Sequence, residues 1–453
     1  MRRPTRTSLI AAALLVAALA IRVVEVASTS YRPINDAGSY LTLASEIAHT
    51  GGYPTSHRPG AGAGGTRGPS AYFPPAFPYL LAAVDLIDGN TSRRGGAVQP
   101  ARFSQAVLGT VAVAFVGLVA GELFGDVVAL IALGLAAFYP VLVELSAVLV
   151  AENLMATLIL AATWAALRAR RSQHPYRWIA ATGVLAGLAA LAHVNSLVVI
   201  LPLAFAAWRV RRRWIAPVLL VAAALLTISP WIVRNAVVLH RFVWITDETG
   251  ITLRGTYNPA SAAYSPVPYK WRIFYGIPGE RPLIRQESRL TEPDLSARLE
   301  RQAFDYIGAH PLAPLEVLYH NSLRLLELEG SFAWRKSAYA QGIPGGIADA
   351  GVVVFWILGA LALAGAFTHR VRSVPAWVWA IPLLLWLSAA LINAETPRFR
   401  EPVDVFLILS AACAIAAAPR VVRRLARPPV GRERRPAIPA GPGQLVEVVE
   451  RLA

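Results

Sequence analysis

Carboxylates and arginines recur at the ends of apolar runs in this chain of 453 residues. Asp36 follows the first apolar run, Glu152 lies near the turn between the runs at 127–143 and 147–167, and Arg398 and Arg400 precede the last run. A carboxylate within hydrogen-bond reach of a hydroxyl can act as a general base, and arginine binds phosphate through two parallel hydrogen bonds. The combination indicates chemistry in which a phosphate leaves and a hydroxyl loses its proton.

Other polar residues lie at similar positions. Arg234 ends the apolar run at 214–233, and we expect it to bind phosphate together with the two arginines near the last run. We expect Asp36 and Glu152 to be the catalytic acidic residues. Four further side chains are candidates for contact with substrate: Tyr40, His193, Asn195 and Asn235.

Each candidate also has a structural explanation. Asp36 would be a suitable cap for a helix that begins at Ala37, and Glu152 could mark an ordinary helix end. Arginines at the membrane surface can anchor to lipid headgroups, and a lone histidine at a helix end is usually structural. Tyr40 fits an interfacial aromatic belt. Because ionisable groups at membrane depth are costly, they tend to line cavities and pair with one another, which favours the chemical interpretation of the whole set.

The composition is that of a membrane protein. Hydrophobic residues make up 55% of the chain and charged residues 15%, whereas soluble chains carry about 25% charged residues. The net charge of +16 comes mainly from arginines in short loops, a pattern that orients membrane helices and does not indicate nucleic-acid binding. The single cysteine, Cys413, excludes an intrachain disulfide, and no nucleotide-binding motif is present.

Ten apolar runs are expected to span the membrane. They are 8–27, 103–121, 127–143, 147–167, 178–192, 195–208, 214–233, 347–367, 374–392 and 402–418. The segment 72–87 holds three prolines and Asp85, and if it also spanned, the arginines at 168–177 and 209–213 would face outward. We therefore expect 72–87 to be juxtamembrane or re-entrant, with both chain termini in the cytoplasm.

This topology predicts the division of the chain. Residues 1–234 would form a transmembrane catalytic module that includes an extracytoplasmic loop at 28–102. Residues 235–346 would form an extracytoplasmic loop domain, with an amphipathic helix at 291–310 that Thr291 and Asp294 cap. Residues 347–419 would add C-terminal transmembrane helices, and the basic tail 420–453 would be disordered.

Several segments, in this order, resemble a known family. They read NDAGSYLTLASEIAHTGGYP, YFPPAFPYLLAAV, ARFSQAVLGTVAVAFVGLVAGELFG, FYPVLVELSAVLVAENL, SPWIVRNAVVLHRFVWITDETGITLRGTYNP and TPRFREPVDVFLILSA. The chain is similar to the polytopic GT-C glycosyltransferases, in particular to bacterial relatives of the protein O-mannosyltransferases and of the aminoarabinose transferase that acts on lipid A. The resemblance covers most of residues 8–418.

The resemblance implies an all-α, GT-C-like bundle of about ten transmembrane helices with juxtamembrane helices and a small loop domain. It implies an inverting hexosyl or pentosyl transferase with a polyprenyl-phosphate sugar donor, in a bacterial inner membrane. Asp36 would be the catalytic base, Glu152 the second acidic residue, and Arg234, Arg398 and Arg400 donor-phosphate or structural positions. The first motif holds one Asp where the eukaryotic O-mannosyltransferases have Asp-Glu, so no divalent metal or other cofactor is expected.

The acceptor would be extracytoplasmic and could be a protein, a glycolipid or a cell-wall glycan. A polytopic transporter or lipid flippase is the alternative function, since it would use similar spans and polar groups with no covalent chemistry. Transporters often contain internal repeats and broken helices near the membrane midplane. The halves of this chain show no convincing duplication, and its polar groups gather at one predicted face, which favours the transferase.

Overall fold

A computed structural model describes residues 6–54, 65–89, 97–211 and 214–425. Across these ranges the chain is helical, with no named strand and one isolated bridge between Arg67 and Thr291. Residues 6–416 lie within one compact unit, and the described part of the second unit, residues 417–425, is helical. Most of the tail that the sequence predicts to be disordered lies outside the described residues.

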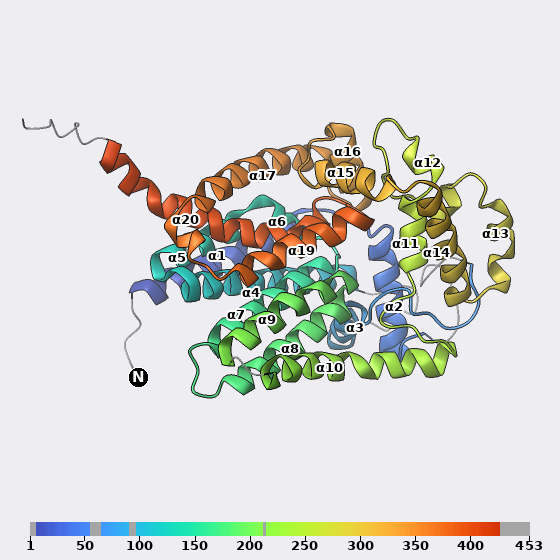
Figure 1. Cartoon of the computed structure of the whole chain (residues 1–453), viewed down its shortest axis with the longest axis horizontal. Coiled ribbons are helices and arrows are strands. Elements are labelled where there is room, and N and C mark those ends of the chain that lie inside the picture. Colours follow the sequence, from blue (N-terminus) through green and yellow to red (C-terminus); the bar gives the residue numbers. More distant parts are fainter. Residues whose placement is uncertain (1–5, 55–64, 90–96, 212–213, 426–453) are drawn as a thin grey trace, which may run out of the picture. The chain divides into compact units, whose positions relative to one another are not determined.

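The longer helices run alongside one another within the first unit (Figure 1). They are α1 (Arg6–Ser28), α4 (Val98–Phe124), α5 (Asp126–Phe138), α7 (Glu152–Ala169), α8 (Pro175–Ala192), α9 (Ile200–Arg211), α10 (Ile215–Leu239), α17 (Gly345–Ala366), α19 (Ala376–Ile392) and α20 (Glu401–Leu425).

Shorter helices connect and cover them. They are α2 (Asp36–Thr50), α3 (Ala76–Asp88), α6 (Pro140–Leu145), α11 (Thr249–Thr256), α12 (Pro259–Ala262), α13 (Arg281–Gln286), α14 (Glu292–Ala309), α15 (Ala313–Leu325), α16 (Ser331–Ala340) and α18 (His369–Arg372). Four 3-10 turns complete the order: η1 (Val194–Val199), η2 (Phe274–Gly276), η3 (Glu287–Arg289) and η4 (Arg398–Arg400).

Five helical segments in the described part of the chain are long and apolar enough to cross a membrane. They are Arg6–Ser28, Val98–Phe124, Ile215–Leu239, Gly345–Ala366 and Arg398–Ala418. Three shorter apolar helices are Asp126–Phe138, Val194–Val210 and Ala376–Ile392. The chain is therefore a multi-pass membrane protein, and the count of ten spans stays a prediction. Helix α3, in the segment expected to be juxtamembrane, has 13 residues and is not among these candidates.

Two of the predicted spans are not single regular helices. The run at 127–143 is divided between α5 and α6 at Pro140, whose ring nitrogen has no hydrogen to donate to the preceding turn. The residue before this proline, Tyr139, is extended, as the proline ring favours. The run at 195–208 begins with the 3-10 turn η1 before it continues as α9.

Helices α4 and α7 run parallel, and polar contacts fix their register at both ends. At one end the Asn153 amide donates to the Gln105 side chain, with 3.0 Å between nitrogen and oxygen. At the other end Arg168 donates to the Glu122 carboxylate over 3.0 Å. Glu152 and Arg168 thus mark opposite ends of α7, so the basic loop at 168–177 lies at the end of the bundle away from Glu152.

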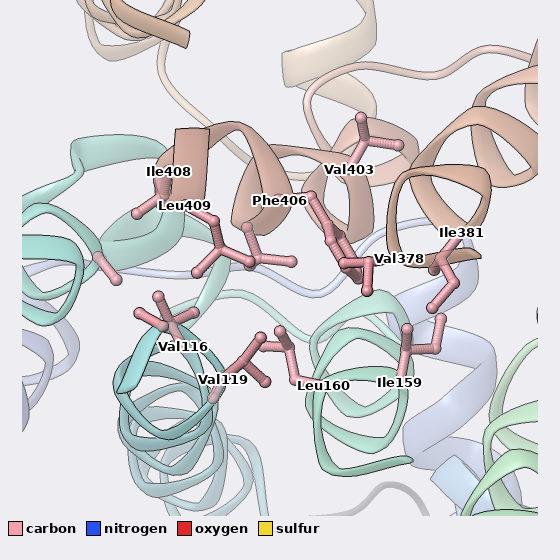
Figure 2. Close-up of a cluster of buried hydrophobic side chains, with 14 of the residues drawn as sticks. Val116, Val119, Ile159, Leu160, Val378, Ile381, Val403, Phe406, Ile408 and Leu409 are labelled. Carbon is pink, nitrogen blue, oxygen red and sulfur yellow. The ribbon is translucent and has the colours of Figure 1, made fainter. Parts of the chain in front are cut away.

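Part of the core of the bundle is built from apolar side chains of two N-terminal and two C-terminal helices. Figure 2 shows residues of α4, α7, α19 and α20 converging, and they are fully or nearly fully buried. The labelled side chains are Val116, Val119, Ile159, Leu160, Val378, Ile381, Val403, Phe406, Ile408 and Leu409. Close packing at this point holds the middle of α7, the first turns of α19 and the start of α20 in fixed relative positions.

Residues 235–346 pack against the same end of the bundle as α2 and α3 (Figure 1). The predicted amphipathic helix is confirmed as α14, where the Thr291 hydroxyl accepts from the Asp294 backbone N–H. Helix α11 is joined to the end of α19, because Thr256 Oγ1 donates to the Ile392 carbonyl over 2.6 Å and the Tyr257 hydroxyl donates to the Leu391 carbonyl over 2.7 Å. The predicted domain boundaries stay predictions.

Helices α8 and α10 approach closely where α8 presents two glycines one turn apart. A Cβ added at Gly183 would lie 2.2 Å from the Leu220 carbonyl oxygen, and one at Gly187 would lie 2.8 Å from that of Ala224. Small residues four positions apart are the usual means by which membrane helices pack closely. This contact sets the position of the end of α8.

We expect Gly183→Ala to lower the free energy of unfolding by about 1–3 kcal/mol, because the added methyl group meets backbone that has no room to yield. The measurement is the unfolding midpoint of the purified protein in detergent. Gly134→Ala in α5 is the matched control, since nothing lies within 4 Å of its added Cβ. Equal midpoints for the two variants would contradict the close contact between α8 and α10.

Candidate functional site

A cavity of about 210 Å³ lies at the end of the bundle next to the loop region. Helix ends and turns from distant parts of the chain form its wall. The lining residues include Tyr31, Asn35, Asp36, Tyr72, His193, Asn195, Glu248, Trp271, Gln341, Asn393, Glu395, Arg398 and Phe399. Four residues expected from the sequence thus meet there: Asp36, His193, Asn195 and Arg398.

The central contact of the cavity joins Asp36 to Arg398. Arg398 Nη1 donates to Asp36 Oδ2 over 2.7 Å, although the two residues are 362 positions apart. Asp36 is the first residue of α2, and the cap residue before it, Asn35, makes no side-chain cap hydrogen bond. Asn35, the cap residue, has a positive φ of 49°, and its amide donates to the Ala340 carbonyl over 3.0 Å. The local turn therefore directs Asp36 away from its own helix and toward Arg398.

Glu152 and His193 lie behind this pair. Glu152 Oε1 is 3.6 Å from Arg398 Nε and 3.8 Å from His193 Nε2. His193 Nδ1 accepts from the Asn195 backbone N–H over 3.4 Å, so its proton is on Nε2, the nitrogen that faces Glu152. Burial lowers the pKa of His193, and the ring is neutral at pH 7. Asp36, Glu152 and Arg398 thus form one charged cluster with an adjacent neutral imidazole.

Arg234 does not reach the cavity. Its guanidinium donates to the carbonyls of Ser70 and Pro54 over 2.7 and 3.0 Å, and it lies over the rings of Tyr53 and Trp231. These contacts join the end of α10 to the loop at 28–102. The structure thus places Arg234 outside the lining of this cavity, with three of its five N–H donors used by protein groups, and its role in phosphate binding stays a prediction.

Asn235 and Tyr40 are also outside the cavity. Asn235 is fully buried and donates to the Val243 carbonyl over 3.3 Å. The Tyr40 ring packs against Phe73 and Phe77, with ring centroids 4.7 and 4.9 Å apart. Neither residue lines this cavity, and their contact with a substrate stays a prediction.

Arg400 is held in a separate buried network. Its Nη1 donates to Glu327 Oε1 over 2.8 Å and to the Leu325 carbonyl over 3.0 Å, while its Nε lies 3.2 Å from Asp404 Oδ1. It is 1% exposed. Of the three predicted phosphate-binding arginines, Arg398 alone lines the cavity, and Arg400 joins α20 to the residues that follow α15.

Glu248 lines the cavity and was not predicted from the sequence. It is the residue before α11, and burial, followed by the nearby charge of Asp36, raises the pKa of its carboxyl to about 8. It is therefore protonated at pH 7. Its sequence context, Thr-Asp-Glu-Thr-Gly, lies in a loop without periodicity, so the only available signal was its place in the motif segment after Pro-Trp-x-x-Arg-Asn.

A second ion pair forms part of the wall. Lys270 Nζ donates to both carboxylate oxygens of Glu395, over 2.8 and 2.9 Å, and to the Ser337 hydroxyl over 2.9 Å. Burial alone would raise the pKa of Glu395, but the Lys270 ammonium reverses this, so the pKa lies below its ordinary value. Lysine is rare in this chain, with Lys336 as the second one, and that rarity was the signal for a specific role.

The described residues contain no group of three or more His, Cys, Asp and Glu side chains placed to hold a metal ion. The lack of a metal requirement stays a prediction. The arrangement does supply one carboxylate with an oxygen that has no partner among the described residues, one guanidinium, one neutral imidazole and one protonated carboxyl. Such a set can accept a proton from a hydroxyl and hold an anionic leaving group.

We expect Lys270→Met to lower the free energy of unfolding by about 3 kcal/mol, because it leaves the Glu395 carboxylate buried without its partner. Adding Glu395→Gln should recover most of that loss. Denaturant unfolding of the purified variants measures both values. Arg335→Met removes one partner of the more exposed pair with Asp349 and should have a much smaller effect. A double variant as unstable as Lys270→Met would contradict the pairing.

Comparisons with known proteins give two kinds of match. Residues 73–233 match the family described as dolichyl-phosphate-mannose-protein mannosyltransferase, and no curated protein sequence matches the chain. The oligosaccharyltransferase of Archaeoglobus fulgidus, tethered to an acceptor peptide, has a similar structure with a TM-score of 0.54 and 16% identity. That match covers 92% of this chain and 50% of the oligosaccharyltransferase.

A second structure of this enzyme, AglB in complex with an inhibitory peptide and a dolichol-phosphate, has a TM-score of 0.52 and 14% identity, with 92% and 52% of the two chains covered. ArnT from Cupriavidus metallidurans bound to undecaprenyl phosphate has a TM-score of 0.40 and 14% identity, over 92% and 80% of the chains. The chain spans about half the length of the archaeal enzyme. Residues 73–233 are thus similar to the dolichyl-phosphate-mannose-protein mannosyltransferase family, and the fold of the chain is similar to that of the archaeal oligosaccharyltransferase.

Proposed function

We propose that this chain is an inverting glycosyltransferase that moves a hexosyl or pentosyl group from a polyprenyl-phosphate donor to an extracytoplasmic acceptor. The acceptor is a protein, a glycolipid or a cell-wall glycan. The enzyme lies in a bacterial inner membrane with both termini in the cytoplasm and the cavity facing outward. Asp36 is the general base, and the reaction needs no metal.

The pair of Asp36 and Arg398 in one cavity is the observation that carries this proposal. Only Oδ2 of Asp36 accepts from Arg398, and Oδ1 has no hydrogen-bond partner among the described residues. The Asp36 side chain is 39% exposed, so an acceptor hydroxyl can approach Oδ1. A positioned carboxylate of this kind typically contributes about 10²–10⁴-fold to a rate when it removes a proton in the transition state.

Arg398 provides the positive charge for the leaving group. Its guanidinium has five N–H donors, and the pair with Asp36 uses one through Nη1. Nε is buried with no hydrogen bond, and Glu152 lies just beyond hydrogen-bond distance from it. The remaining donors can bind a phosphate oxygen, and the charge stabilises the polyprenyl phosphate as it leaves.

In the proposed step, the acceptor oxygen attacks the anomeric carbon while the bond from this carbon to the phosphate oxygen breaks. The acceptor proton passes to Asp36, and the electron pair of the broken bond leaves with the polyprenyl phosphate. One base and one leaving group on opposite sides of the sugar give inversion. Glu152 orients Arg398 from the side opposite Asp36, and His193 borders Glu152.

A lipid-linked donor fits the surroundings of the cavity. An apolar groove of about 440 Å³ lies between α1, α5, α17 and α20 and includes Leu14, Phe138 and Leu361. It shares Pro140 with a small cavity that also contacts Pro397, the residue before Arg398. Dolichol-phosphate is bound in the similar archaeal enzyme, and an acceptor peptide is tethered to it in another structure. A polyprenyl tail in this groove would bring the phosphate toward Arg398.

A transporter is the competing function. Transporters hold their substrate near the membrane midplane, commonly at broken helices. The charged cluster in this chain instead lies at one end of the bundle, where α7 begins and α8 and α19 end. The position favours surface chemistry on a lipid headgroup over passage across the membrane.

We expect Asp36→Asn to lower the transfer rate by at least about 10²-fold, since the amide cannot accept the proton. The assay reconstitutes the protein in vesicles with a labelled undecaprenyl-phosphate sugar and membranes of the source cells as acceptor, and follows the transfer of label from the donor lipid to any other product, lipid or delipidated. Asp305→Asn, an exposed change of the same chemistry, should retain the parental rate. An Asp36→Asn variant with the parental rate would remove Asp36 from the mechanism.

The rate should also fall as the pH rises above about 8. Glu248 is neutral below its pKa and becomes negative above it, which places a second carboxylate beside Asp36 and repels the donor phosphate. Glu248→Gln cannot ionise, so it should keep its rate at pH 9. Initial rates between pH 6 and pH 10 test this. If the initial rates of the parent and of Glu248→Gln fall equally above pH 8, ionisation of Glu248 is not the cause of the fall.

A further inference from the structure

Four amide side chains from four separate elements line the cavity. Asn35 precedes α2, Asn195 lies in η1, Gln341 follows α16, and Asn393 follows α19. An amide group offers one acceptor oxygen and two N–H donors, which suits hydroxyl groups because they both donate and accept. Of these four amides, all within the described residues, only that of Gln341 bonds to the end of its own helix, where its nitrogen donates to the Ser337 carbonyl of α16.

Two of these amides are held by backbone carbonyls through their nitrogen atoms. Asn35 Nδ2 donates to Ala340, and Gln341 Nε2 donates to Ser337 and Thr396 over 3.0 and 2.9 Å. This fixes the groups and leaves their oxygens as acceptors. Gln341 Oε1 and Asn393 Oδ1 are both buried without a hydrogen-bond partner among the described residues. Buried acceptors without a partner are costly, so their presence in one cavity indicates a ligand with donors.

The charged groups that line the cavity indicate whether its ligand is itself charged. The Asp36 carboxylate is paired with Arg398, and Glu395 is paired with Lys270. Burial keeps Glu248 protonated at pH 7, because its pKa is about 8. Each lining carboxyl group is thus either protonated or already paired with a cation, and an ammonium group would compete with Arg398 or Lys270 for its partner. A sugar with a free amino group would place a positive charge beside residues whose own charges are already paired. Uncharged hydroxyl groups can instead form hydrogen bonds with the four amides.

We infer that Asn35, Asn195, Gln341 and Asn393 form a subsite that binds the hydroxyl groups of an uncharged sugar and selects it over an amino sugar. The inference rests on the proposed function, whose donor delivers this sugar beside Asp36. The amide oxygens accept from the sugar hydroxyls, and the free N–H groups of Asn195 and Asn393 donate to them. The four residues determine specificity and take no part in proton transfer.

The test is donor binding, which needs no knowledge of the acceptor. Purified protein in lipid nanodiscs is titrated with undecaprenyl phosphate alone, undecaprenyl-phosphate mannose, undecaprenyl-phosphate arabinose and undecaprenyl-phosphate 4-amino-4-deoxyarabinose. At least one neutral sugar lipid should bind about tenfold more tightly than the bare phosphate and than the amino-sugar lipid. Asn393→Leu should lose most of that advantage while binding the bare phosphate as the parent does.

Asn393→Asp provides the opposite change. It keeps the size of the side chain and adds a carboxylate, so the preference should move toward the amino-sugar lipid by roughly tenfold. Gln286→Met, an exposed amide replacement on α13, should leave all four affinities unchanged. Unfolding midpoints of each variant separate a folding defect from loss of binding, and Asn393→Asp keeps the test decisive if Asn393→Leu fails to fold.

The outcomes distinguish this inference from the proposed function. The inferred subsite is contradicted if the neutral sugar lipids bind no better than undecaprenyl phosphate alone, or if the parent protein binds the amino-sugar lipid best. This holds even when the vesicle assay detects transfer. If no donor gives transfer in the vesicle assay and bare undecaprenyl phosphate does not bind, the glycosyltransferase proposal itself fails. Unchanged affinities in both Asn393 variants would also overturn the subsite.

Discussion

The architecture of the site depends on one constraint: charges at the end of an apolar helix bundle must find partners within the protein. Asp36 and Arg398 meet this constraint over 2.7 Å, from opposite ends of the sequence. Their pairing requires the chain to bring the start of α2 against the turn before α20. Glu152, buried at the start of α7, shares the same guanidinium from its other side. The cavity is the space left where these helix ends meet.

The helix ends meet at the cavity because the rest of the bundle is tightly packed. Aliphatic side chains of α4, α7, α19 and α20 interdigitate, and the two glycines of α8 allow α10 to approach. Polar contacts at both ends of α4 and α7 prevent these helices from sliding. The apolar core therefore sets distances between charged groups that it does not itself touch.

The sequence predicted this arrangement in part. Asp36, Glu152 and Arg398 were identified because ionisable residues at the ends of apolar runs are unusual, and the structure brings all three together. Arg234 and Arg400 carried the same signal, yet carbonyls and buried carboxylates occupy their guanidinium groups. The type of a residue and its position in the sequence do not reveal whether its N–H groups already donate to other groups of the protein. Glu248 and Lys270 were missed because loop residues lack the periodicity that makes helices readable.

The attachment of α11 to α19 has a consequence for how substrates enter. Thr256 and Tyr257 hold the last carbonyls of α19, and Asn393 and Glu395 follow directly after that helix. Any shift of α11 that admits a bulky acceptor must carry these two residues with it. A displacement of α11 would therefore also disturb the part of the cavity wall that Asn393 and Glu395 form, so the loop region and the proposed sugar subsite are mechanically linked.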